Sequence, residues 1–380
     1  MKKEVERKGL RTWIEVDTKA LAHNYKALRG AISADCRLMA VAKSNAYGHS
    51  LLDFAREIEK LGEDWIGVDS IVEAIALREA GIVAPIFVLG YTLPEMLSRA
   101  AELDISIAVS TFETLAAISA GNFSKKLKIH IKVDTGMHRQ GFQEGEMTRV
   151  IDEVKKLVDK IEVEGLFTHF AAAKNPAFPQ RTLAQLALFE KWAEAFKQAG
   201  FNPIKHTCAS GGALIFPQAH FDMVRVGIAM YGLYASKETE SFSKDKIDLQ
   251  PILSWRTLIG EVKKVPKGDR VGYDFTEEFQ RDSKIAICPI GYWHGYPRSL
   301  SSIGHVIVNG KKARVIGRVS MDMITIDVTD VPDVKVGDVV TLIGTDGSET
   351  VSAGDLADLV DGSLYEMITR LNPLIKRIYV

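Results

Sequence analysis

The lysine at position 43 is the first residue of this chain whose type and place suggest chemistry. An apolar run over residues 36–42 ends at Lys43, and Asn45, Gly48 and a helical pattern follow, with Tyr47 one helical turn on. An ammonium group at the end of a buried strand is unfavourable to desolvate unless it is paired or chemically altered. One such alteration is a Schiff base, which consumes the amine and anchors aldehyde cofactors to enzymes. The alternative is a lysine that extends from the strand end into solvent, as most lysines do.

Further polar residues stand where later apolar runs end, and they include cations and a glycine-rich turn. In chain order these candidates are Lys132, Asp134, Arg139, Thr168, His169, Ser210 and Arg225, and the backbone at Gly227 and Ile228 follows them. Arginine, lysine and backbone amides together suit a ligand that carries phosphate and carboxylate groups. Two alternatives stay open. Arg225 could be a core arginine paired with Asp222 or another acidic neighbour, and His169 could be a core histidine with its hydrogen bonds satisfied.

The elements that must position these residues alternate between apolar and amphipathic stretches over the first two-thirds of the chain. Expected strands cover residues 36–43, 65–69, 85–90, 104–109, 127–134, 162–168, 204–208 and 223–231, and expected helices cover residues 49–61, 70–80, 93–102, 111–120, 146–159 and 181–199. Eight such strands favour a (β/α)8 barrel of the TIM type over an open doubly wound sheet. Because active sites of these barrels lie at the carboxyl ends of the strands, we expect the polar residues to converge there.

The pattern changes after about residue 240. Short β-rich runs separated by turns cover residues 259–265, 285–289, 304–308, 313–316, 324–328 and 339–343, with a short helix expected at 352–360. The Asn309-Gly310 pair predicts a hairpin. We therefore expect an α/β protein with a barrel domain over residues 11–240 and a mainly antiparallel β domain over residues 241–380. Residues 11–16 also read as a strand and are a candidate to pair with the second domain.

Composition places further limits on function. Of the 380 residues, 46% are hydrophobic and 26% are charged, and the net charge of −1 gives no indication of nucleic-acid or anionic-membrane binding. The N-terminus lacks the apolar segment of a signal peptide, and no apolar run reaches the ~20 residues of a membrane span. The three cysteines are far apart in apolar runs, which predicts a cytoplasmic protein with reduced thiols. The sequence has no cluster with metal-ligand spacing.

Eight motifs along the chain resemble those of alanine racemases, which are pyridoxal-phosphate enzymes of fold type III. They are Ala40-Val-Ala-Lys-Ser-Asn-Ala-Tyr-Gly-His49, Lys132-Val-Asp-Thr-Gly-Met-His-Arg139, Thr168-His-Phe-Ala171, Met223-Val-Arg-Val-Gly-Ile-Ala-Met-Tyr-Gly232, Val271-Gly-Tyr273, Pro289-Ile-Gly-Tyr292, Gly317-Arg-Val-Ser-Met-Asp322 and Tyr365-Glu366. They run in the family's order from about residue 11 to the C-terminus. The resemblance implies conversion of L-alanine to D-alanine, which supplies peptidoglycan, by a homodimer with shared active sites.

The resemblance also implies roles for individual residues. Lys43 would hold pyridoxal 5′-phosphate and act as one catalytic base, and Tyr273 of the other subunit would be the second. Arg225 would face the pyridine nitrogen, with His169 supporting it. The residues around the phosphate would be Tyr47, Ser210, Gly227, Ile228 and Tyr365. Residues at the substrate would be Arg139 and the backbone of Met321, with Lys132 carbamylated to hold Arg139 and with Asp322 and Tyr292 in support.

Racemisation fits this set of residues chemically. A proton must leave one face of the α-carbon and return on the other, so two bases on opposite faces suffice. Lysine and tyrosine are weak bases at their free pKa of ~10, and a cationic pocket lowers both values. Arg225 beside the pyridine nitrogen disfavours its protonation, because the guanidinium keeps its own proton. A carbamate on Lys132 would reverse its charge and replace repulsion from Arg139 with attraction.

Some positions depart from the commonest family pattern, and they leave alternatives open. The departures are the segment Asp274–Glu277, the pair Trp293-His294, Lys174 and Ser320. They put substrate breadth in doubt more than reaction type, so a serine or broad-specificity small amino-acid racemase is the first alternative. A pyridoxal-phosphate-binding regulatory protein of the same barrel type is less favoured because such proteins lack the β domain. A decarboxylase is disfavoured because Arg225 stands where those enzymes carry a carboxylate.

Overall fold

The first two-thirds of the chain fold as eight parallel strands in one sheet, in the order β8-β7-β6-β5-β4-β3-β2-β9. The strands are β2 (Arg37–Val41), β3 (Trp65–Val68), β4 (Ile86–Val88), β5 (Ile105–Val109), β6 (Leu127–Lys132), β7 (Ile161–Phe167), β8 (Ile204–His206) and β9 (Met223–Val226). Two backbone hydrogen bonds, from Asp222 N to Lys205 O and from Arg225 N to Cys208 O, join the segments of β8 and β9 and nearly close the barrel. The predicted (β/α)8 barrel is therefore confirmed.

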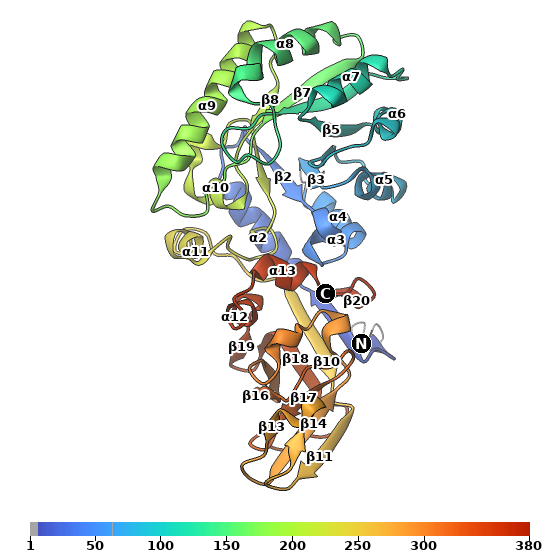
Figure 1. Cartoon of the computed structure of the whole chain (residues 1–380), viewed down its shortest axis with the longest axis vertical. Coiled ribbons are helices and arrows are strands. Elements are labelled where there is room, and N and C mark those ends of the chain that lie inside the picture. Colours follow the sequence, from blue (N-terminus) through green and yellow to red (C-terminus); the bar gives the residue numbers. More distant parts are fainter. Residues whose placement is uncertain (1–6, 63) are drawn as a thin grey trace. The chain divides into compact units, whose positions relative to one another are not determined.

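Helices follow the strands and lie on the outside of the sheet, as Figure 1 shows for α5, α6, α8 and α9. The helices of this part are α2 (Thr18–Gly30), α3 (Lys43–Tyr47), α4 (Leu51–Lys60), α5 (Ile71–Glu79), α6 (Leu97–Glu102), α7 (Phe112–Ala120), α8 (Met147–Lys156), α9 (Pro179–Gln198), α10 (Ser210–Ile215) and α11 (Lys237–Ser243). Side chains from six strands fill the barrel centre; they are Met39, Trp65, Phe87, Ala108, Phe167 and Met223. The strand expected over residues 223–231 ends at Val226, because the chain turns there.

The second part of the chain forms a mainly antiparallel sheet in the order β11-β14-β17-β16-β15-β18-β10-β1-β20, with β19 paired to β18. Its strands are β1 (Thr12–Val16), β10 (Leu253–Leu258), β11 (Glu261–Val265), β14 (Ser283–Cys288), β15 (His305–Val308), β16 (Lys311–Ile316), β17 (Ile324–Asp327), β18 (Val339–Asp346), β19 (Glu349–Val351) and β20 (Lys376–Tyr379). The strands β12 (Arg270–Val271) and β13 (Glu277–Glu278) form a separate pair, and the helices are α12 (Ala353–Asp358) and α13 (Leu364–Thr369).

Strand β1 pairs antiparallel with β10 and parallel with β20. The hairpin predicted at Asn309-Gly310 is present between β15 and β16, with positive φ of 49° and 72° at the two turn residues. Two positive φ values are what a two-residue hairpin turn of type I′ requires.

The computed structural model describes residues 7–62 and 64–380, and these form two compact units. The barrel unit comprises residues 19–46 and 51–251, and the β unit comprises residues 7–18, 47–50 and 252–380. Within the described residues, no helix is both long enough and apolar enough to cross a membrane. All three cysteines are buried free thiols.

Candidate active site

The backbone directly after Lys43 has left-handed φ values. Ser44, Asn45, Ala46 and Tyr47 have φ of 56°, 57°, 52° and 51°, which places four successive non-glycine residues in the left-handed region. Each such residue costs roughly 1–2 kcal/mol. Tyr47 therefore lies one helical turn after Lys43, as expected, but this turn is left-handed.

Glu73 holds this turn in place. One oxygen of its carboxylate accepts hydrogen bonds from the backbone N–H groups of Ser44 (2.8 Å) and Asn45 (3.4 Å). The other oxygen accepts from Asp69 and Ser70 at the start of α5, where Ser70 and Glu73 form a capping box. One carboxylate thus ties the strained turn to the end of the neighbouring strand β3.

The Lys43 side chain is 40% exposed, and its Nζ lies 3.8 Å from Asp69 Oδ1. The lysine is thus less desolvated than its place after a buried strand suggested. Its ammonium is partly hydrated and loosely paired with Asp69, so it can reach a ligand at the strand ends without leaving a deeply buried ion pair.

Four cations share the carboxyl ends of the strands in the barrel unit. Burial and, to a smaller extent, the positive charges of Arg139, Arg225 and Lys43 together lower the pKa of Lys132 to about 8, although Asp134 opposes them. The same cations and burial lower the pKa of His169 to about 3, so its ring is neutral at physiological pH. These mutual effects show that Lys43, Lys132, Arg139, His169 and Arg225 converge on one site with an excess of positive charge.

Arg225 is buried and held by backbone carbonyl groups. Its NH1 donates to His206 O at 2.8 Å, and its NH2 donates to Thr168 O and Thr207 O at 2.8 and 3.0 Å. NH2 also lies 3.4 Å from His169 Nδ1. The alternative that Arg225 pairs with Asp222 is wrong, because that carboxylate binds Lys205 at 3.0 Å.

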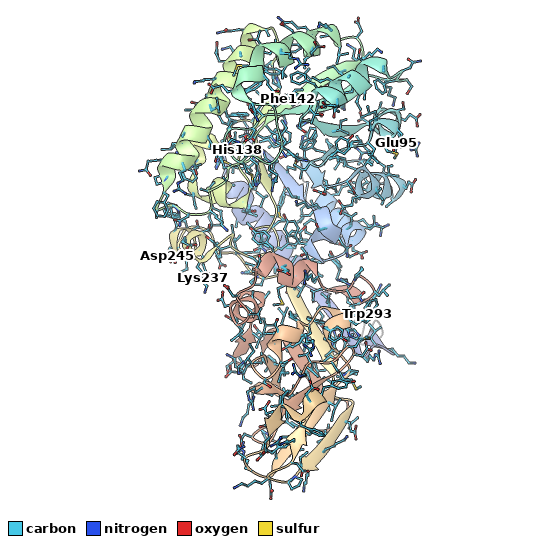
Figure 2. All side chains as sticks on the ribbon, in the orientation of Figure 1. Glu95, His138, Phe142, Lys237, Asp245 and Trp293 are labelled. Carbon is cyan, nitrogen blue, oxygen red and sulfur yellow. The ribbon has the colours of Figure 1, made fainter. Side chains whose placement is uncertain are left out.

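The loop between β6 and α8 carries Arg139. It folds back on its own strand through hydrogen bonds from Phe142 N to Lys132 O and from Asp134 N to Phe142 O. Phe142 is buried against Phe112, with ring centroids 5.1 Å apart, and the nearby His138 is exposed (Figure 2). Arg139 itself is exposed and makes no ion pair among the residues that the structure describes.

Two further contacts complete this rim. The Oγ of Ser210 accepts hydrogen bonds from the N–H groups of Gly227 (3.0 Å) and Ala229 (3.3 Å), which ties the turn after β8 to the turn after β9. Lys132 Nζ donates to Gln140 Oε1 at 2.8 Å. Ile228 is buried beside Gly227 in the same turn.

The other predicted site residues lie in the β unit. The rings of Tyr47 and Tyr365 have centroids 6.3 Å apart and planes tilted by 49°, and burial raises the pKa of Tyr365 to about 12. Tyr273 is 70% exposed and stands in a tight turn, where Asp274 and Phe275 have φ of 62° and 50°. Within this turn Asp274 binds Arg318 at 2.9 Å.

Backbone hydrogen bonds clamp the loop of Met321 to the loop of Tyr292. Tyr292 N donates to Ser320 O, and Trp293 N donates to Met321 O, both at 3.0 Å. A Cβ at Gly291 would lie 2.1 Å from Ser320 O and 2.5 Å from Met321 O, so only glycine permits this approach. Within the described residues, no hydrogen bond of the Met321 N–H is found.

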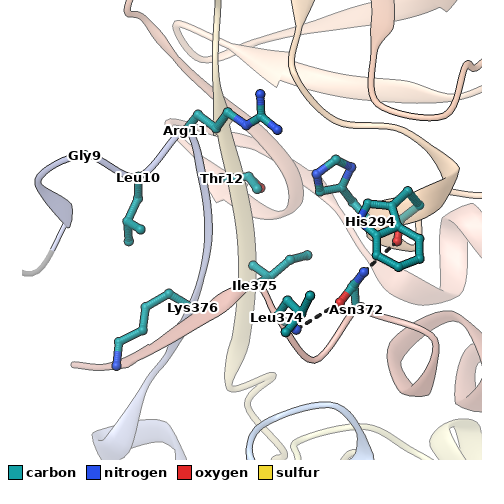
Figure 3. A pocket seen from close by; sticks show the side chains of 10 residues that line it. Gly9, Leu10, Arg11, Thr12, His294, Asn372, Leu374, Ile375 and Lys376 are labelled. Carbon is teal, nitrogen blue, oxygen red and sulfur yellow. Dashed lines mark hydrogen bonds between the residues drawn. The ribbon is translucent and has the colours of Figure 1, made fainter.

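Next to these loops, His294 Nδ1 lies 4.0 Å from Asp322 Oδ1, and burial lowers the pKa of the histidine. Trp293 and His294 also line a surface cavity of about 240 Å³ together with residues 9–12, 372 and 374–376. Figure 3 shows His294 and Asn372 on one side of this cavity and Lys376 on the other. The side chains around it are mixed, with Leu10, Leu374 and Ile375 beside the polar groups of Arg11, His294 and Lys376.

Several residues of the rim were missed in the sequence. They are Asp69, Glu73, Gln140 and His206. Glu73 had a readable signal in the capping box that begins at Ser70. The other residues had no recognisable signal in the sequence, because any residue that the fold brings near can supply such a partner.

A nearly closed (β/α)8 barrel with a cationic rim, followed by an antiparallel β domain, is the architecture of an α/β protein whose site suits a ligand with anionic groups. Family models described as the N-terminal and C-terminal domains of alanine racemase match residues 16–235 and 252–379. The chain belongs to the alanine racemase family.

Individual relatives agree with the family models. The chain is 39% identical to alanine racemase 1 of Oceanobacillus iheyensis over 97% of this chain and 98% of the relative. It is 38% identical to the alanine racemase of Methanococcus maripaludis, with the same shares covered. A crystal structure of alanine racemase from Bacillus anthracis with bound L-Ala-P has a TM-score of 0.91 and 36% identity, over 97% of this chain and 95% of that one. Like its relatives, this chain is an alanine racemase enzyme with a small-molecule substrate.

Proposed function

We propose that this enzyme converts L-alanine to D-alanine with pyridoxal 5′-phosphate as cofactor and with two bases, Lys43 and Tyr273. The observation that carries the proposal is the unbalanced positive charge around Lys43 at the strand ends. It supports a ligand that brings at least two anionic groups, a phosphate and an amino-acid carboxylate. D-alanine made in the cytoplasm would serve peptidoglycan synthesis.

The residues present fit this cofactor. Lys43 has the amine for covalent attachment, and its partial exposure leaves that amine accessible. The side chains and backbone that would hold the cofactor are Tyr47, Arg139, His169, Ser210, Arg225, Gly227, Ile228 and Tyr365. The unpaired Arg139 and the lowered pKa of Lys132 both indicate a site that an anion would stabilise. When bound, the cofactor withdraws electrons from the α-carbon and makes its proton acidic.

Arg225 would remain a hydrogen-bond donor to the pyridine nitrogen. Burial lowers its pKa to about 10, which still leaves the guanidinium protonated near neutral pH. The carbonyl groups of Thr168, His206 and Thr207 fix its plane. A donor that keeps its proton does not give the ring nitrogen a full positive charge, so the withdrawal of electrons stays moderate and side reactions are limited.

The two bases divide the proton transfer between opposite faces of the α-carbon. Lys43 Nζ would remove or return the proton on one face, and the Tyr273 hydroxyl would do so on the other. Arg139 and the Met321 N–H would bind the substrate carboxylate and keep the α-carbon between the bases. Asp322 and Tyr292 would support the Met321 loop, since both flank its backbone clamp.

Lys132 is a candidate for carbamylation. Its pKa of about 8 leaves part of the amine neutral near pH 7.5, and only the neutral amine can attack carbon dioxide. The reaction forms an N–C bond and releases one proton, and the product is an anion that would attract Arg139. Intact-protein mass with and without bicarbonate tests this, and a plain amine under both conditions would contradict it.

The exposure of Tyr273 supports a homodimer. A base that is 70% exposed cannot be shielded from water by its own chain, so a second subunit is the simplest cover. We propose that each β unit supplies Tyr273 to the partner's barrel. Mixing Lys43→Ala and Tyr273→Phe subunits should restore one intact site per mixed dimer. Mixtures that stay as inactive as their components would contradict shared sites.

A serine or broader racemase remains the second candidate. Trp293 is 58% exposed, and its backbone is hydrogen-bonded to Met321, so this bulky residue is a neighbour of the proposed carboxylate site. Comparison of kcat/KM for alanine, serine and lysine separates the candidates. If kcat/KM is larger for serine than for alanine, serine is the preferred substrate.

The central test measures interconversion of the alanine enantiomers and the state of Lys43. The purified enzyme should show a visible absorption band, and borohydride should abolish it while adding the cofactor's mass to the peptide with Lys43. Lys43→Ala should lose both the attachment and at least about 10³-fold in kcat/KM. Lys60→Ala is the control, because Lys60 is exposed and, among the residues that the structure describes, pairs with Glu57.

A further inference from the structure

A chain of hydrogen bonds runs from Arg225 through the centre of the barrel, and most of it has no part in the function proposed above. Arg225 NH1 lies 2.9 Å from Nδ1 of His206, and Nε2 of His206 lies 2.8 Å from Nδ1 of His130. Nε2 of His130 in turn lies 3.0 Å from Oε2 of Glu164. Ser106 Oγ donates to the same carboxylate oxygen. Both histidines are 0% exposed.

The two end groups determine which atom donates and which accepts in every hydrogen bond of this series. A guanidinium has only donors, so Nδ1 of His206 must accept, and its ring proton must sit on Nε2. That N–H then donates to Nδ1 of His130, whose own proton must also sit on Nε2. Glu164, an acceptor, receives this last proton. Each tautomer is therefore determined by its neighbour from one end of the chain to the other.

The backbone of β7 is built to bring Glu164 to this place. In the ladder with β6, Val163 pairs with Ile129 and Gly165 pairs with His130, so Glu164 is an extra residue in a β-bulge. Bulges re-aim side chains. At Gly165, a Cβ would lie 2.1 Å from Nδ1 of His130, so the absence of a side chain there makes room for the ring.

Aromatic packing prevents the two rings from turning over. Phe87 stacks on His130 with centroids 4.1 Å apart, and Phe167 stacks on His206 with centroids 4.9 Å apart and planes at 2°. Burial lowers the pKa of both histidines, and the charge of Arg225 adds to this, so both rings stay neutral. Moving a proton between ring nitrogens is thus the freedom that remains to them.

Glu164 keeps its charge in spite of its surroundings. Burial would raise the pKa of its carboxyl group, but the hydrogen bonds from His130 and Ser106, with the charge of Lys128, hold that pKa below its usual range. Lys128 Nζ lies 3.9 Å from Glu164 and 2.9 Å from Asp104. An ionised carboxylate can only accept, which makes Glu164 a one-way anchor for the chain.

We propose that Glu164 is a positioning residue that fixes the Nε2-protonated tautomers of His130 and His206 and thereby holds Arg225 in its active-site orientation. Arg225 still favours Nε2–H on His206, but without Glu164 the Nε2–H of His130 loses its acceptor, and the opposite tautomers, with both protons on Nδ1, become competitive. His206 would then point an N–H at the N–H of Arg225, and the guanidinium would have to shift away from its carbonyl partners.

The test compares three variants of the full-length enzyme in which histidine is labelled with ¹⁵N. Glu164→Leu removes the acceptor, and Glu164→Gln keeps an acceptor oxygen but no charge. Glu162→Leu is the matched control, since it removes an exposed carboxylate two residues away on the same strand. Long-range ¹H–¹⁵N spectra report which ring nitrogen is protonated. The wild-type, Glu164→Gln and Glu162→Leu enzymes should keep Nε2–H in both rings, and Glu164→Leu should convert at least half of His206 to Nδ1–H.

The kinetic arm rests on the proposed racemisation, whereas the spectra do not. Glu164→Leu should lower kcat/KM for alanine by about 10–100-fold, comparable to the loss of an outer-shell hydrogen-bond partner at a metal site. Glu164→Gln should restore it to within about 3-fold. Wild-type tautomers in Glu164→Leu, or an equal loss in Glu162→Leu, would overturn the proposal. An inactive wild-type enzyme would refute the proposed function and leave the spectra to decide the role of Glu164.

Discussion

The rim of the barrel unit and the loops of the β unit present their proposed functional groups in opposite ways. At the rim, Arg225 is buried and makes hydrogen bonds to three carbonyl groups, and Lys132 is buried and bonded to Gln140. In the β unit, Tyr273 and Met321 are 70% and 54% exposed, and their positions come from strained or clamped backbone.

The two regions would therefore contribute to catalysis in different ways. The rim holds its charges before any ligand arrives, so its electrostatic field is preorganised and a bound anion relieves the repulsion among the cations. The β-unit loops fix main-chain geometry and leave side chains open to water. They would become effective only when covered, which agrees with a site completed by a second subunit.

The largest effect that separates the two regions is expected from Tyr273→Phe. Removal of the hydroxyl should lower racemisation by about 10²–10⁴-fold, because general acid–base groups typically contribute that much. Exchange of the α-hydrogen with D₂O should persist for the enantiomer deprotonated by Lys43 and fall for the other. Tyr91→Phe, at an exposed tyrosine of the barrel unit, should change neither rate. Equal exchange losses for both enantiomers would mean that Tyr273 is not a base for one face.

A smaller effect is expected when the backbone clamp is loosened by Gly291→Ala. The new Cβ would meet Ser320 O and Met321 O, so the two loops must move apart. We expect a loss of about 1–3 kcal/mol in unfolding free energy and a rise in KM that exceeds any fall in kcat. Gly145→Ala, where a Cβ would meet nothing within 4 Å, is the matched control for denaturant unfolding and steady-state kinetics. A normal KM would show that the clamp does not position the substrate.

The smallest effect concerns the charge of the rim and the stability of the protein without cofactor. The pKa of His169 is about 3 in the folded protein and ~6.5 in an unfolded chain, so below pH 6.5 only the unfolded chain takes up the proton. Stability therefore falls as pH decreases, by about 1.4 kcal/mol per pH unit for this group, and the effect is absent above pH ~7. His169→Asn should flatten the unfolding free energy between pH ~6.5 and ~5. A His138→Asn variant, altered at an exposed histidine, should keep the wild-type slope.

Much of the architecture was readable from the sequence. The eight parallel strands fall within one to five residues of the predicted bounds, because continuous apolar runs between helical patterns have few other solutions. The strand β10 was missed although its burial alternates along Leu253–Leu258, and the helix α13 and strand β20 were not predicted either. Arg256 lies in the middle of β10 and interrupts its apolar pattern. Its partners Glu15 and Thr341 are distant in sequence, so the pattern alone did not predict a strand.

The candidate site was predictable in its residue types and less so in its geometry. Lys43, Lys132 and Arg225 were expected at one rim, and their mutual effects on pKa place them there. The left-handed turn could not be foreseen, since Ser44 and Ala46 have no preference for it and a remote carboxylate, Glu73, stabilises it. The roles assigned to individual residues stay predictions.

The turn after Lys43 has a consequence for the stereochemistry of the chain itself. Positive φ is strained for an L-residue and relaxed for its mirror image, so a D-residue is the unstrained choice at an exposed position such as Ser44. A semisynthetic enzyme with D-serine there should gain about 1–2 kcal/mol in stability without displacing Lys43. The backbone of this turn therefore has the conformation that a D-residue prefers, although ribosomes incorporate L-residues.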